Sequence, residues 1–221
     1  DAYSLHRILK TDIKKDPNLE EDEIIFGCGC FWGAEKCFWK LPGVVTTSVG
    51  YAGGKKNNPT YYEVCSGLTG HSEVVRVIWD KREIDVSDLL KMFWECHDPT
   101  QKNRQGNDMG TQYRSAIYYK NENNIKTILA SKEQYQTELS KKNLGLIETE
   151  IKMIDSYFYA EQYHQQYLAS AGSRQYCSAS PTKVKLGLFT GSNYKLEDHI
   201  WENFNWEVDK CVLRSDNNPI K

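Results

Sequence analysis

The sequence lacks a long apolar run, a Cys-x-x-Cys pair and any strong excess of charge of one sign. A membrane-spanning helix needs roughly 20 consecutive apolar residues, so we expect none in this chain. The 221 residues include 28 basic and 30 acidic side chains, which gives a net charge of −2. This balance favours neither nucleic acid nor an anionic membrane surface as a partner.

The chain contains seven cysteines, an odd number, and it is too long for a small scaffold held together by disulfides. We therefore expect mostly reduced thiols in an intracellular, cytoplasmic protein, and we expect a monomer. The chain starts at Asp1 rather than methionine, which indicates a mature or trimmed form and leaves room for a removed organelle-targeting segment. Structural zinc is a competing interpretation, but Cys28 and Cys30 are separated by one residue only, and we expect no metal site.

The composition divides the chain into three parts. Residues 1–22 are polar and predict an arm that lies on the surface or is disordered. Residues 23–170 carry the regular apolar patterns of one domain. Residues 171–221 predict a long C-terminal coil that packs on this domain, because the segment is too apolar for a free tail. Its large apolar residues are Leu186, Leu188, Phe189, Trp201, Phe204 and Trp206.

The order of the predicted elements indicates the fold class. The patterns predict strands at 23–28, 44–51, 71–80, 114–119 and 147–154, and helices at 31–41, 85–96, 122–142 and 160–170. This order predicts an α/β (α+β) fold, a two-layer sandwich around a mixed sheet. The first six elements match a ferredoxin-like βαββαβ core.

The segment 23–35 joins an apolar strand to a helix through Gly27-Cys28-Gly29. Cys30 then lies at the start of the helix, where free N–H groups and the helix dipole favour a thiolate. Phe31 and Trp32 place two aromatic side chains beside the sulfur. The alternative is a small apolar cysteine in a buried turn; the flanking glycines and aromatics favour a reactive thiol.

Three further positions have both a functional and a structural interpretation. Glu73 shares one face of its strand with Val75 and Val77, so partial burial would raise the pKa of its carboxyl and suit a general acid. An exposed glutamate at a strand end is equally compatible with this pattern. Tyr61 is ambiguous alone, because aromatic residues near loops usually serve packing. His164 is typical of a structural histidine rather than a catalytic base.

A long polar loop at 98–113 completes the set of candidate segments, since loops of this length in compact domains are often functional. Five segments together resemble the A-type peptide methionine sulfoxide reductases. They are Gly29-Cys30-Phe31-Trp32-Gly33, Asn58-Pro59-Thr60-Tyr61, Thr69-Gly70-His71-Ser72-Glu73-Val74-Val75, the two loop pieces His97-Asp98-Pro99-Thr100 and Gly106-Asn107-Asp108-Met109-Gly110-Thr111-Gln112-Tyr113-Arg114-Ser115, and Ala160-Glu161-Gln162-Tyr163-His164-Gln165-Gln166-Tyr167. The resemblance runs from about residue 23 to residue 177.

The resemblance implies an enzyme that reduces the S epimer of free and protein-bound methionine sulfoxide, and so repairs oxidised proteins. It assigns the nucleophile to Cys30 and the acid to Glu73, which settles the ambiguity of that strand. Tyr61 and Tyr113 would donate hydrogen bonds to the sulfoxide oxygen, and Asp108 would order its loop and polar groups of the substrate. The methyl group would contact apolar surface of Phe31, Trp32 and Tyr113.

The resemblance also implies that Cys30 becomes a sulfenic acid, which a second thiol converts to a disulfide. Thioredoxin or another dithiol would reduce this disulfide, and no bound cofactor is expected. Gln175-Tyr176-Cys177 resembles the segment with the first recycling cysteine of the family. Cys211 departs from the family because it lies much farther along the tail, so a bystander and a second recycling cysteine are both open. We interpret Cys28, Cys37, Cys65 and Cys96 as packing residues.

Two other functions fit parts of the sequence. A papain-like cysteine hydrolase would pair Cys30 with His71 or His164, because that chemistry needs a histidine as base. A thiol redox sensor would pair Cys30 with Cys177 without turning over a sulfoxide. The glutamate in the motif at 69–75 and the tail thiol favour the reductase over the hydrolase.

Overall fold

The computed structural model describes residues 4–221, and its centre is a six-stranded sheet in the order β7-β6-β1-β3-β2-β8. Only β6 and β7 pair in parallel; every other neighbouring pair in this sheet is antiparallel. The strands are β1 (Glu21–Cys28), β2 (Val44–Ala52), β3 (Ser72–Asp80), β6 (Ser115–Tyr119), β7 (Glu150–Met153) and β8 (Tyr157–Tyr159). A separate two-stranded ribbon consists of β4 (Arg104–Gln105) and β5 (Asp108–Met109).

The helices vary from short single turns to α4, which is 17 residues long. The α-helices are α1 (Phe31–Trp39), α2 (Tyr61–Cys65), α3 (Val86–Glu95), α4 (Ile125–Lys141), α5 (Asp198–Trp201) and α6 (Cys211–Arg214). The 3₁₀ helices are η2 (Thr111–Tyr113), η3 (Glu122–Asn124), η4 (Gln162–His164) and η5 (Tyr167–Ala169). None of the helices within residues 4–221 has both the length and the apolar character needed to span a bilayer.

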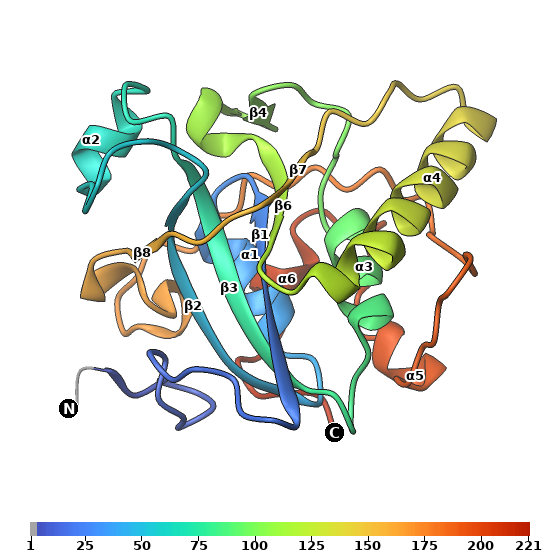
Figure 1. Cartoon of the computed structure of the whole chain (residues 1–221), viewed down its shortest axis with the longest axis horizontal. Coiled ribbons are helices and arrows are strands. Elements are labelled where there is room, and N and C mark those ends of the chain that lie inside the picture. Colours follow the sequence, from blue (N-terminus) through green and yellow to red (C-terminus); the bar gives the residue numbers. More distant parts are fainter. Residues whose placement is uncertain (1–3) are drawn as a thin grey trace.

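The two faces of the sheet are covered differently. Helix α1 packs on β2 and β3, and α3 packs between α1 and α4, so that these helices and the main core share one face. The chain from β7 to β8 crosses the other face (Figure 1), where Ile154 and Tyr157 pack on a smaller cluster. This arrangement of a mixed sheet with helices confirms the predicted α/β class. The strands β7 and β8 extend both edges of the predicted βαββαβ unit, and its ferredoxin-like description stays a prediction.

Side-chain alternation along β3 explains how the site is positioned. Val75 and Val77 point into the core under α1, whereas Val74 belongs to the smaller cluster on the opposite face. Glu73 has the same parity as Val75, so its carboxyl also points toward α1. The helix begins at Phe31, directly after Cys30, and therefore Glu73 and the N-terminus of α1 meet.

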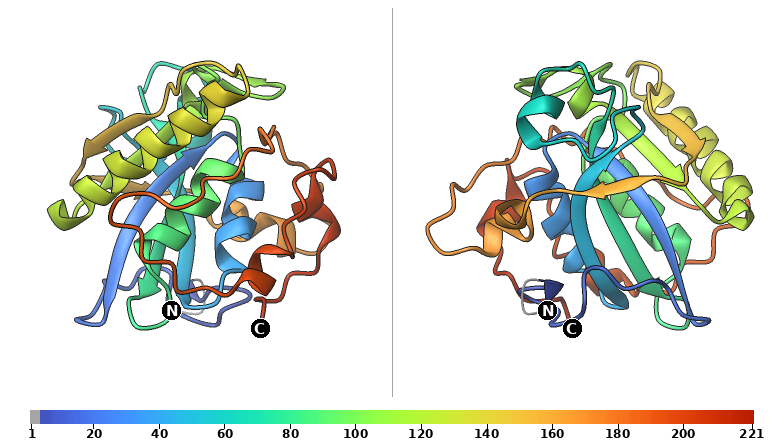
Figure 2. Two further views of the ribbon diagram at one scale, coloured as in Figure 1. Left: turned by 90° about the vertical axis from the view of Figure 1, so that its right-hand side faces the viewer. Right: turned by 60° about the vertical axis from the view of Figure 1, so that its left-hand side comes forward.

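The C-terminal tail wraps around the helical side of the molecule. In Figure 2 the red segment runs past α3 and α1 and ends beside α1. The Lys36 ammonium group donates to the backbone oxygen of Ser215 at 2.7 Å, and the Trp39 ring nitrogen donates to that of Asn217 at 3.0 Å. Several tail side chains belong to the main core, and these are Leu186, Phe189, Ile200, Phe204 and Val212.

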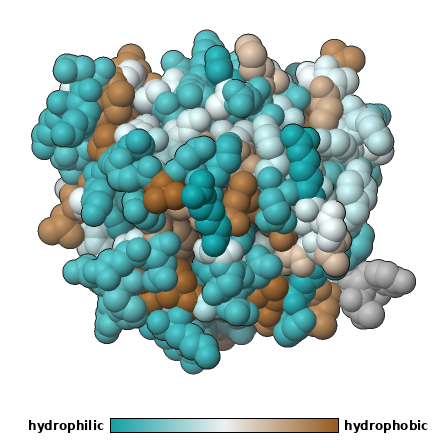
Figure 3. Space-filling model, turned by 180° about the vertical axis from the view of Figure 1, so that it is seen from behind, coloured by the Kyte–Doolittle hydropathy of each residue, from teal (hydrophilic) through white to brown (hydrophobic). Residues whose placement is uncertain are grey.

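Seen from behind, apolar side chains form small separate patches among polar ones (Figure 3).

The N-terminal segment is attached more closely than its polar composition suggests. His6 is fully buried, and its Nε2 lies 2.8 Å from the hydroxyl of Thr47 on β2. Strand β1 already begins at Glu21, inside the predicted arm. Residues 1–3 of that arm lie outside the described residues.

The predicted helix over 160–170 is wrong. The chain instead forms two 3₁₀ turns, η4 and η5, separated by Gln166 in the left-handed region with φ of 47°. The backbone N–H of Gln166 donates to Glu35 Oε1 at 2.8 Å, and its side-chain amide donates to Glu35 Oε2 at 2.9 Å. These bonds to a fully buried carboxyl hold Gln166 in a conformation that ends a helix.

Candidate active site

Cys30 lies between the end of β1 and the first turn of α1. It occupies the N-cap position of the helix and is 8% exposed. Its backbone N–H donates to the Ser178 hydroxyl at 3.3 Å, which ties the tail to the start of α1. Gly29 has φ of 86°, and a Cβ there would lie 2.5 Å from the Cβ of Gln105, so the turn requires glycine.

Glu73 reaches the same helix terminus from strand β3. The carboxyl is 1% exposed, and Oε1 accepts a hydrogen bond from the Phe31 N–H at 3.2 Å. Its second oxygen, Oε2, is buried without a hydrogen-bond partner among residues 4–221. A buried, unpaired oxygen beside the thiol is a place where a substrate atom can gain a hydrogen bond.

Burial controls the protonation of both groups. It raises the pKa of Glu73 to about 8, partly opposed by the Phe31 N–H. Burial, followed by the negative charge of Glu73, raises the pKa of the Cys30 thiol well above its usual range, although the Trp32 N–H acts in the opposite direction. The expectation that the helix start would make this thiol more acidic is therefore wrong for the free site, because desolvation outweighs the helix terminus. Both groups hold their protons near neutral pH.

One pocket brings the predicted site residues together. It has a volume of about 300 Å³ and opens to solvent. Its lining consists of Cys30, Phe31, Trp32, Tyr61, Glu73, Asp108, Tyr113, Arg174 and Tyr176. The first seven were selected from the sequence, and Arg174 and Tyr176 were not; their only signal is their position just before Cys177.

The aromatic wall of the pocket is held in place by neighbours outside it. The Trp32 ring stacks on Tyr167 with centroids 3.9 Å apart, and its Nε1 donates to His164 Nδ1 at 3.0 Å. Burial lowers the pKa of His164 to about 4, so the ring is neutral and accepts this bond. His164 thus positions Trp32, and its ring also packs on Phe31 and Tyr61 at 5.2 and 4.5 Å between centroids.

The two tyrosines of the pocket remain phenols. Burial first, and then the nearby Glu73 carboxylate, raises the pKa of both Tyr61 and Tyr113. Tyr61 is fixed through its backbone N–H, which donates to Glu161 Oε2 at 2.9 Å, and Glu161 Oε1 accepts from the Tyr51 hydroxyl at 2.9 Å. Two neutral O–H groups therefore border the pocket as potential donors.

Asp108 connects the loop to the tail. It lies in β5, and its Oδ1 accepts a hydrogen bond from the Tyr176 hydroxyl at 2.8 Å. The Arg174 guanidinium lies over the Tyr176 ring, 4.8 Å from its centroid. The tail residues next to Cys177 thus contribute to the wall of the pocket.

Both tail cysteines lie outside the substrate pocket and pack against α1. Cys177 is 3% exposed, and its Sγ lies so close to Gly33 that a Cβ at this glycine would be 2.5 Å from it. A small cavity of about 20 Å³ is lined by Cys177 and Cys211 together. The Lys210 ammonium group donates to the backbone oxygen of Cys177, which fixes the Cys211 segment against it. The fold thus brings the two cysteines to the same cavity although they are far apart in the sequence.

The histidines required by a hydrolase are engaged elsewhere. His71 Nδ1 accepts from the Gly54 N–H at 3.0 Å, and its Nε2 lies 2.6 Å from the backbone oxygen of Lys56. His164 is directed at Trp32, as described above. Within residues 4–221, neither ring is hydrogen bonded to Cys30. Cys28, Cys96 and His97 form a group of potential metal ligands outside this pocket.

Comparisons with known proteins agree with this site. The family model for peptide methionine sulfoxide reductase matches residues 22–193. The MsrA enzyme of Vibrio vulnificus is 53% identical over 180 residues, 81% of this chain and 86% of that protein. MsrA of Azotobacter vinelandii is 57% identical over 164 residues, 74% of this chain and 76% of that protein.

Solved structures that resemble this chain belong to the same family. Methionine sulfoxide reductase A of Corynebacterium diphtheriae matches with a TM-score of 0.67 and 41% identity, covering 79% of this chain and 89% of that one. Reduced Mxr1 of Saccharomyces cerevisiae matches with a TM-score of 0.68 and 37% identity, covering 75% of this chain and 93% of that one. Mxr1 in complex with Trx2 matches with a TM-score of 0.51 and 23% identity, which bears on the fold alone. The chain belongs to the peptide methionine sulfoxide reductase family, and it is an oxidoreductase of the MsrA type.

Proposed function

We propose that this enzyme reduces the S epimer of methionine sulfoxide, free or within proteins, through a sulfenic acid on Cys30. The observation that carries the proposal is the carboxyl of Glu73, which is buried, protonated near neutral pH and has one oxygen unpaired beside the thiol. The fold also places the phenols of Tyr61 and Tyr113 in the same pocket. A thiol with a proton donor beside it suits attack at a sulfur whose oxygen must be protonated.

The chemical step balances within these groups. The sulfur of Cys30 attacks the sulfoxide sulfur while Glu73 gives its proton to the oxygen, and the phenolic O–H groups stabilise the charge that gathers there. The thiol proton returns to Glu73 as the sulfur–oxygen bond of the substrate breaks. The sulfur–sulfur bond formed in the attack breaks as the oxygen passes to the Cys30 sulfur, so that Cys30 becomes a sulfenic acid and methionine, reduced by two electrons, departs.

The pocket provides a physical basis for the choice of epimer. The methyl group would lie against Phe31 and Trp32, the oxygen would face Glu73, and the rest of the substrate would point to solvent. A site that fixes three different substituents around one sulfur exposes that sulfur to Cys30 in a single configuration. Because only the side chain of methionine enters, both free methionine sulfoxide and an exposed residue in an oxidised protein fit, which supports a role in protein repair.

Recycling would use the tail. Cys177 attacks the sulfenic sulfur, water leaves, and a Cys30–Cys177 disulfide forms. Cys211, which borders the same cavity as Cys177, can then exchange into this bond and carry the disulfide to the surface, since it is only half-buried. Thioredoxin is the proposed reductant and partner, and the related Mxr1 has been solved with Trx2. The chain needs no further cofactor for these steps.

A coupled assay tests the proposal. Thioredoxin, thioredoxin reductase and NADPH are combined with the protein and with each epimer of a blocked methionine sulfoxide. NADPH consumption is expected with the S epimer, and less than 1% of that rate with the R epimer. Equal rates would reject the epimer assignment. Oxidation of the protein without turnover of either epimer would favour a redox sensor, and hydrolysis of a thioester or peptide probe by Cys30 would favour the hydrolase.

A further inference from the structure

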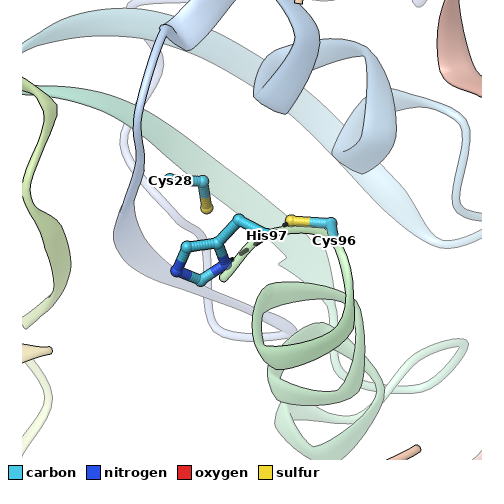
Figure 4. Close-up of side chains that lie close together, drawn as sticks. All are labelled: Cys28, Cys96 and His97. Atoms are coloured by element: carbon cyan, nitrogen blue, oxygen red, sulfur yellow. Dashed lines mark hydrogen bonds between the residues drawn. The ribbon is translucent and has the colours of Figure 1, made fainter. Parts of the chain in front are cut away.

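The reactive side chains that lie together outside the substrate pocket are already satisfied by the protein. Cys28, Cys96 and His97 lie side by side in the core (Figure 4). Burial lowers the pKa of His97 to about 4, so the neutral ring carries one N–H. Its Nδ1 donates to the backbone oxygen of Phe93 at 2.6 Å, and its Nε2 accepts from the Ser115 hydroxyl at 2.8 Å. Both ring nitrogens thus have partners among the described residues, and this group is part of the core.

The substrate pocket, in contrast, has a cationic side chain in its wall. Among the described residues that line this pocket, only Arg174 carries a positive charge. The side chain is exposed, and its guanidinium forms no ion pair with a carboxylate of residues 4–221. The acidic residues of the wall do not neutralise it, because Glu73 is protonated near neutral pH and Asp108 accepts from the Tyr176 hydroxyl. The pocket therefore presents a positive charge that a substrate anion can reach.

Two tyrosines hold Arg174 against the aromatic wall. Its backbone N–H donates to the Tyr167 hydroxyl at 3.1 Å, and its guanidinium lies over the Tyr176 ring, 4.8 Å from the centroid. Both tyrosine rings contact Trp32: Tyr167 stacks on it with centroids 3.9 Å apart, and Tyr176 meets it edge-on at 6.4 Å. The guanidinium is thus held on the same aromatic wall as the surface that would receive the methyl group of the substrate. Holding the cation in place before binding reduces the entropy lost when a ligand pairs with it.

Tyr176 also relates the guanidinium to the reacting sulfur. Burial first, and then Asp108, raises the pKa of the Tyr176 hydroxyl. Cys30 adds to this rise and Arg174 opposes it, so both groups lie close to that hydroxyl. In methionine sulfoxide only Cγ, Cβ and Cα separate the sulfur from the carboxylate carbon. A substrate whose sulfur contacts Cys30 therefore has its backbone at the part of the wall that Arg174 occupies.

We propose that Arg174 binds a carboxylate of the substrate, an inference that rests on the proposed reduction of methionine sulfoxide. A guanidinium pairs with a carboxylate through two parallel hydrogen bonds. The α-carboxylate supplies this group when methionine sulfoxide is free or at a C-terminus, and an acidic side chain next to it supplies the group within a protein. Because Arg174 is exposed, water weakens the pair, so we expect a preference among substrates and not an absolute requirement.

Substrates that differ only in charge test this pairing. The S epimer of N-acetyl methionine sulfoxide is compared with its neutral amide, and a blocked peptide with glutamate directly after methionine sulfoxide is compared with the same peptide containing glutamine. Methionine formation in a single turnover is followed against substrate concentration, since Arg174 is near Cys177 in the chain and a steady-state rate would include recycling.

Arg174→Gln is expected to require roughly fivefold more of the carboxylate substrate for half-maximal rate, with an unchanged maximal rate. The neutral partner of the same pair should change less than about twofold, because it makes no ion pair to lose. Arg174→Lys keeps the charge without the planar fork and should restore part of the preference. The pair of substrates that shows this difference identifies the source of the carboxylate.

Lys185→Gln is the matched control, because it removes one exposed positive charge from the tail outside the substrate pocket. It should leave the rates with all four substrates unchanged, and Tm confirms that each variant is folded. Equal effects of Arg174→Gln on the charged and the neutral member of both pairs, or no effect on either, would overturn the proposal while the wild type still reduces the sulfoxides. Failure of the wild type to reduce any of the four would instead reject the proposed function, and this inference with it.

Discussion

At the scale of single residues, the site depends on a carboxyl group that is uncharged where most glutamates are ionised. The Glu73 carboxyl is buried in the core beneath α1 and has lost its hydration. The single hydrogen bond from the Phe31 N–H does not compensate for this lost hydration of the charged form. Glu73→Gln keeps the shape and removes the transferable proton. We expect single-turnover methionine formation to slow by roughly 10²–10⁴-fold, the range for loss of general acid catalysis. A rate within threefold of wild type at pH 7 would remove Glu73 from this role.

The same carboxyl predicts a pH profile. Because Glu73 must be protonated and burial raises its pKa to about 8, kcat/KM for the S epimer should decline as pH rises through about 8. The rate of the Glu73→Gln variant, which has no proton to lose at this position, should lack that decline. The pKa of the Cys30 thiol is raised well above its usual range. Its ionisation would therefore increase kcat/KM at higher pH and cannot cause the decline. The same decline in both proteins would assign it to another group.

Burial of Glu73 also has a thermodynamic consequence. An acid whose pKa rises from 4.5 in the unfolded chain to about 8 in the folded one stabilises the fold least at high pH. Its contribution is lost as pH rises from about 4.5 to about 8. The free energy of unfolding of Glu73→Gln relative to wild type should therefore increase over this range, by on the order of 4 kcal/mol. Chemical unfolding at pH 5 and pH 8.5 measures the difference, and Glu35, with a pKa of about 7 for the same reason, is present in both proteins.

At the scale of elements, α1 carries two functions on opposite sides. Its N-terminus presents Cys30 to the pocket, and Gly33 one turn later leaves room for Cys177. Gly33→Ala places a methyl group 2.5 Å from the Cys177 sulfur, so this thiol must move. We expect a normal first release of about one methionine per protein, followed by disulfide formation slowed at least tenfold.

The matched control for this change is Gly145→Ala, whose added methyl would meet nothing closer than 3.7 Å. Alanine in a helix interior gains about 0.5–1 kcal/mol over glycine, so a lower Tm for Gly33→Ala would itself indicate the clash. Quenched-flow methionine release and thiol counting measure the two phases. Disulfide formation as fast in Gly33→Ala as in the control would show that Cys177 does not need its place beside Gly33.

The elements that were predicted from the sequence are those with a strong local pattern. The helix expected at 31–41 is Phe31–Trp39, and the alternating strand expected at 71–80 is Ser72–Asp80. The helix expected at 160–170 fails because Glu35, 131 residues away, holds Gln166 in a left-handed conformation. The short strand β8 was missed because its three residues pair only at the edge of the sheet.

The site shows the same division between local and tertiary information. The motif around Cys30 indicated a reactive thiol, whereas the alternation of β3 left Glu73 open between two interpretations, and the family resemblance assigned it the proposed role of acid. The pKa of the Cys30 thiol was expected to lie below its usual value, but it is raised. The reason is burial, which depends on Ser178 and other tail residues that pack over the helix start. The hydrogen bond between Asp108 and Tyr176 joins β5 to the tail, 68 residues apart, and no spacing in the sequence encodes it.

At the scale of the whole molecule, the tail packs along α1 and brings Cys211 to the cavity that Cys177 also lines. Val212 and Leu186 anchor it in the main core, and Lys210 binds the backbone of Cys177. The two tail thiols border one cavity, and Cys211 is the more exposed of them. This arrangement suits a disulfide that forms at Cys30, moves to Cys177 and Cys211, and is then accessible to a reductant.

The order of these exchanges predicts different results for the two tail cysteines. Cys177→Ser should release about one methionine per protein at near-normal speed and then stop with thioredoxin, because the sulfenic acid has no thiol to attack it. Cys211→Ser should form the Cys30–Cys177 bond normally but turn over at least tenfold more slowly with thioredoxin. Mass spectrometry after one equivalent of sulfoxide identifies the disulfides, with exposed Cys65→Ser as the control for a thiol outside the relay. Full turnover in Cys211→Ser, with no Cys177–Cys211 bond in the wild type, would leave Cys211 without a catalytic part. Full turnover in Cys177→Ser would exclude the relay altogether.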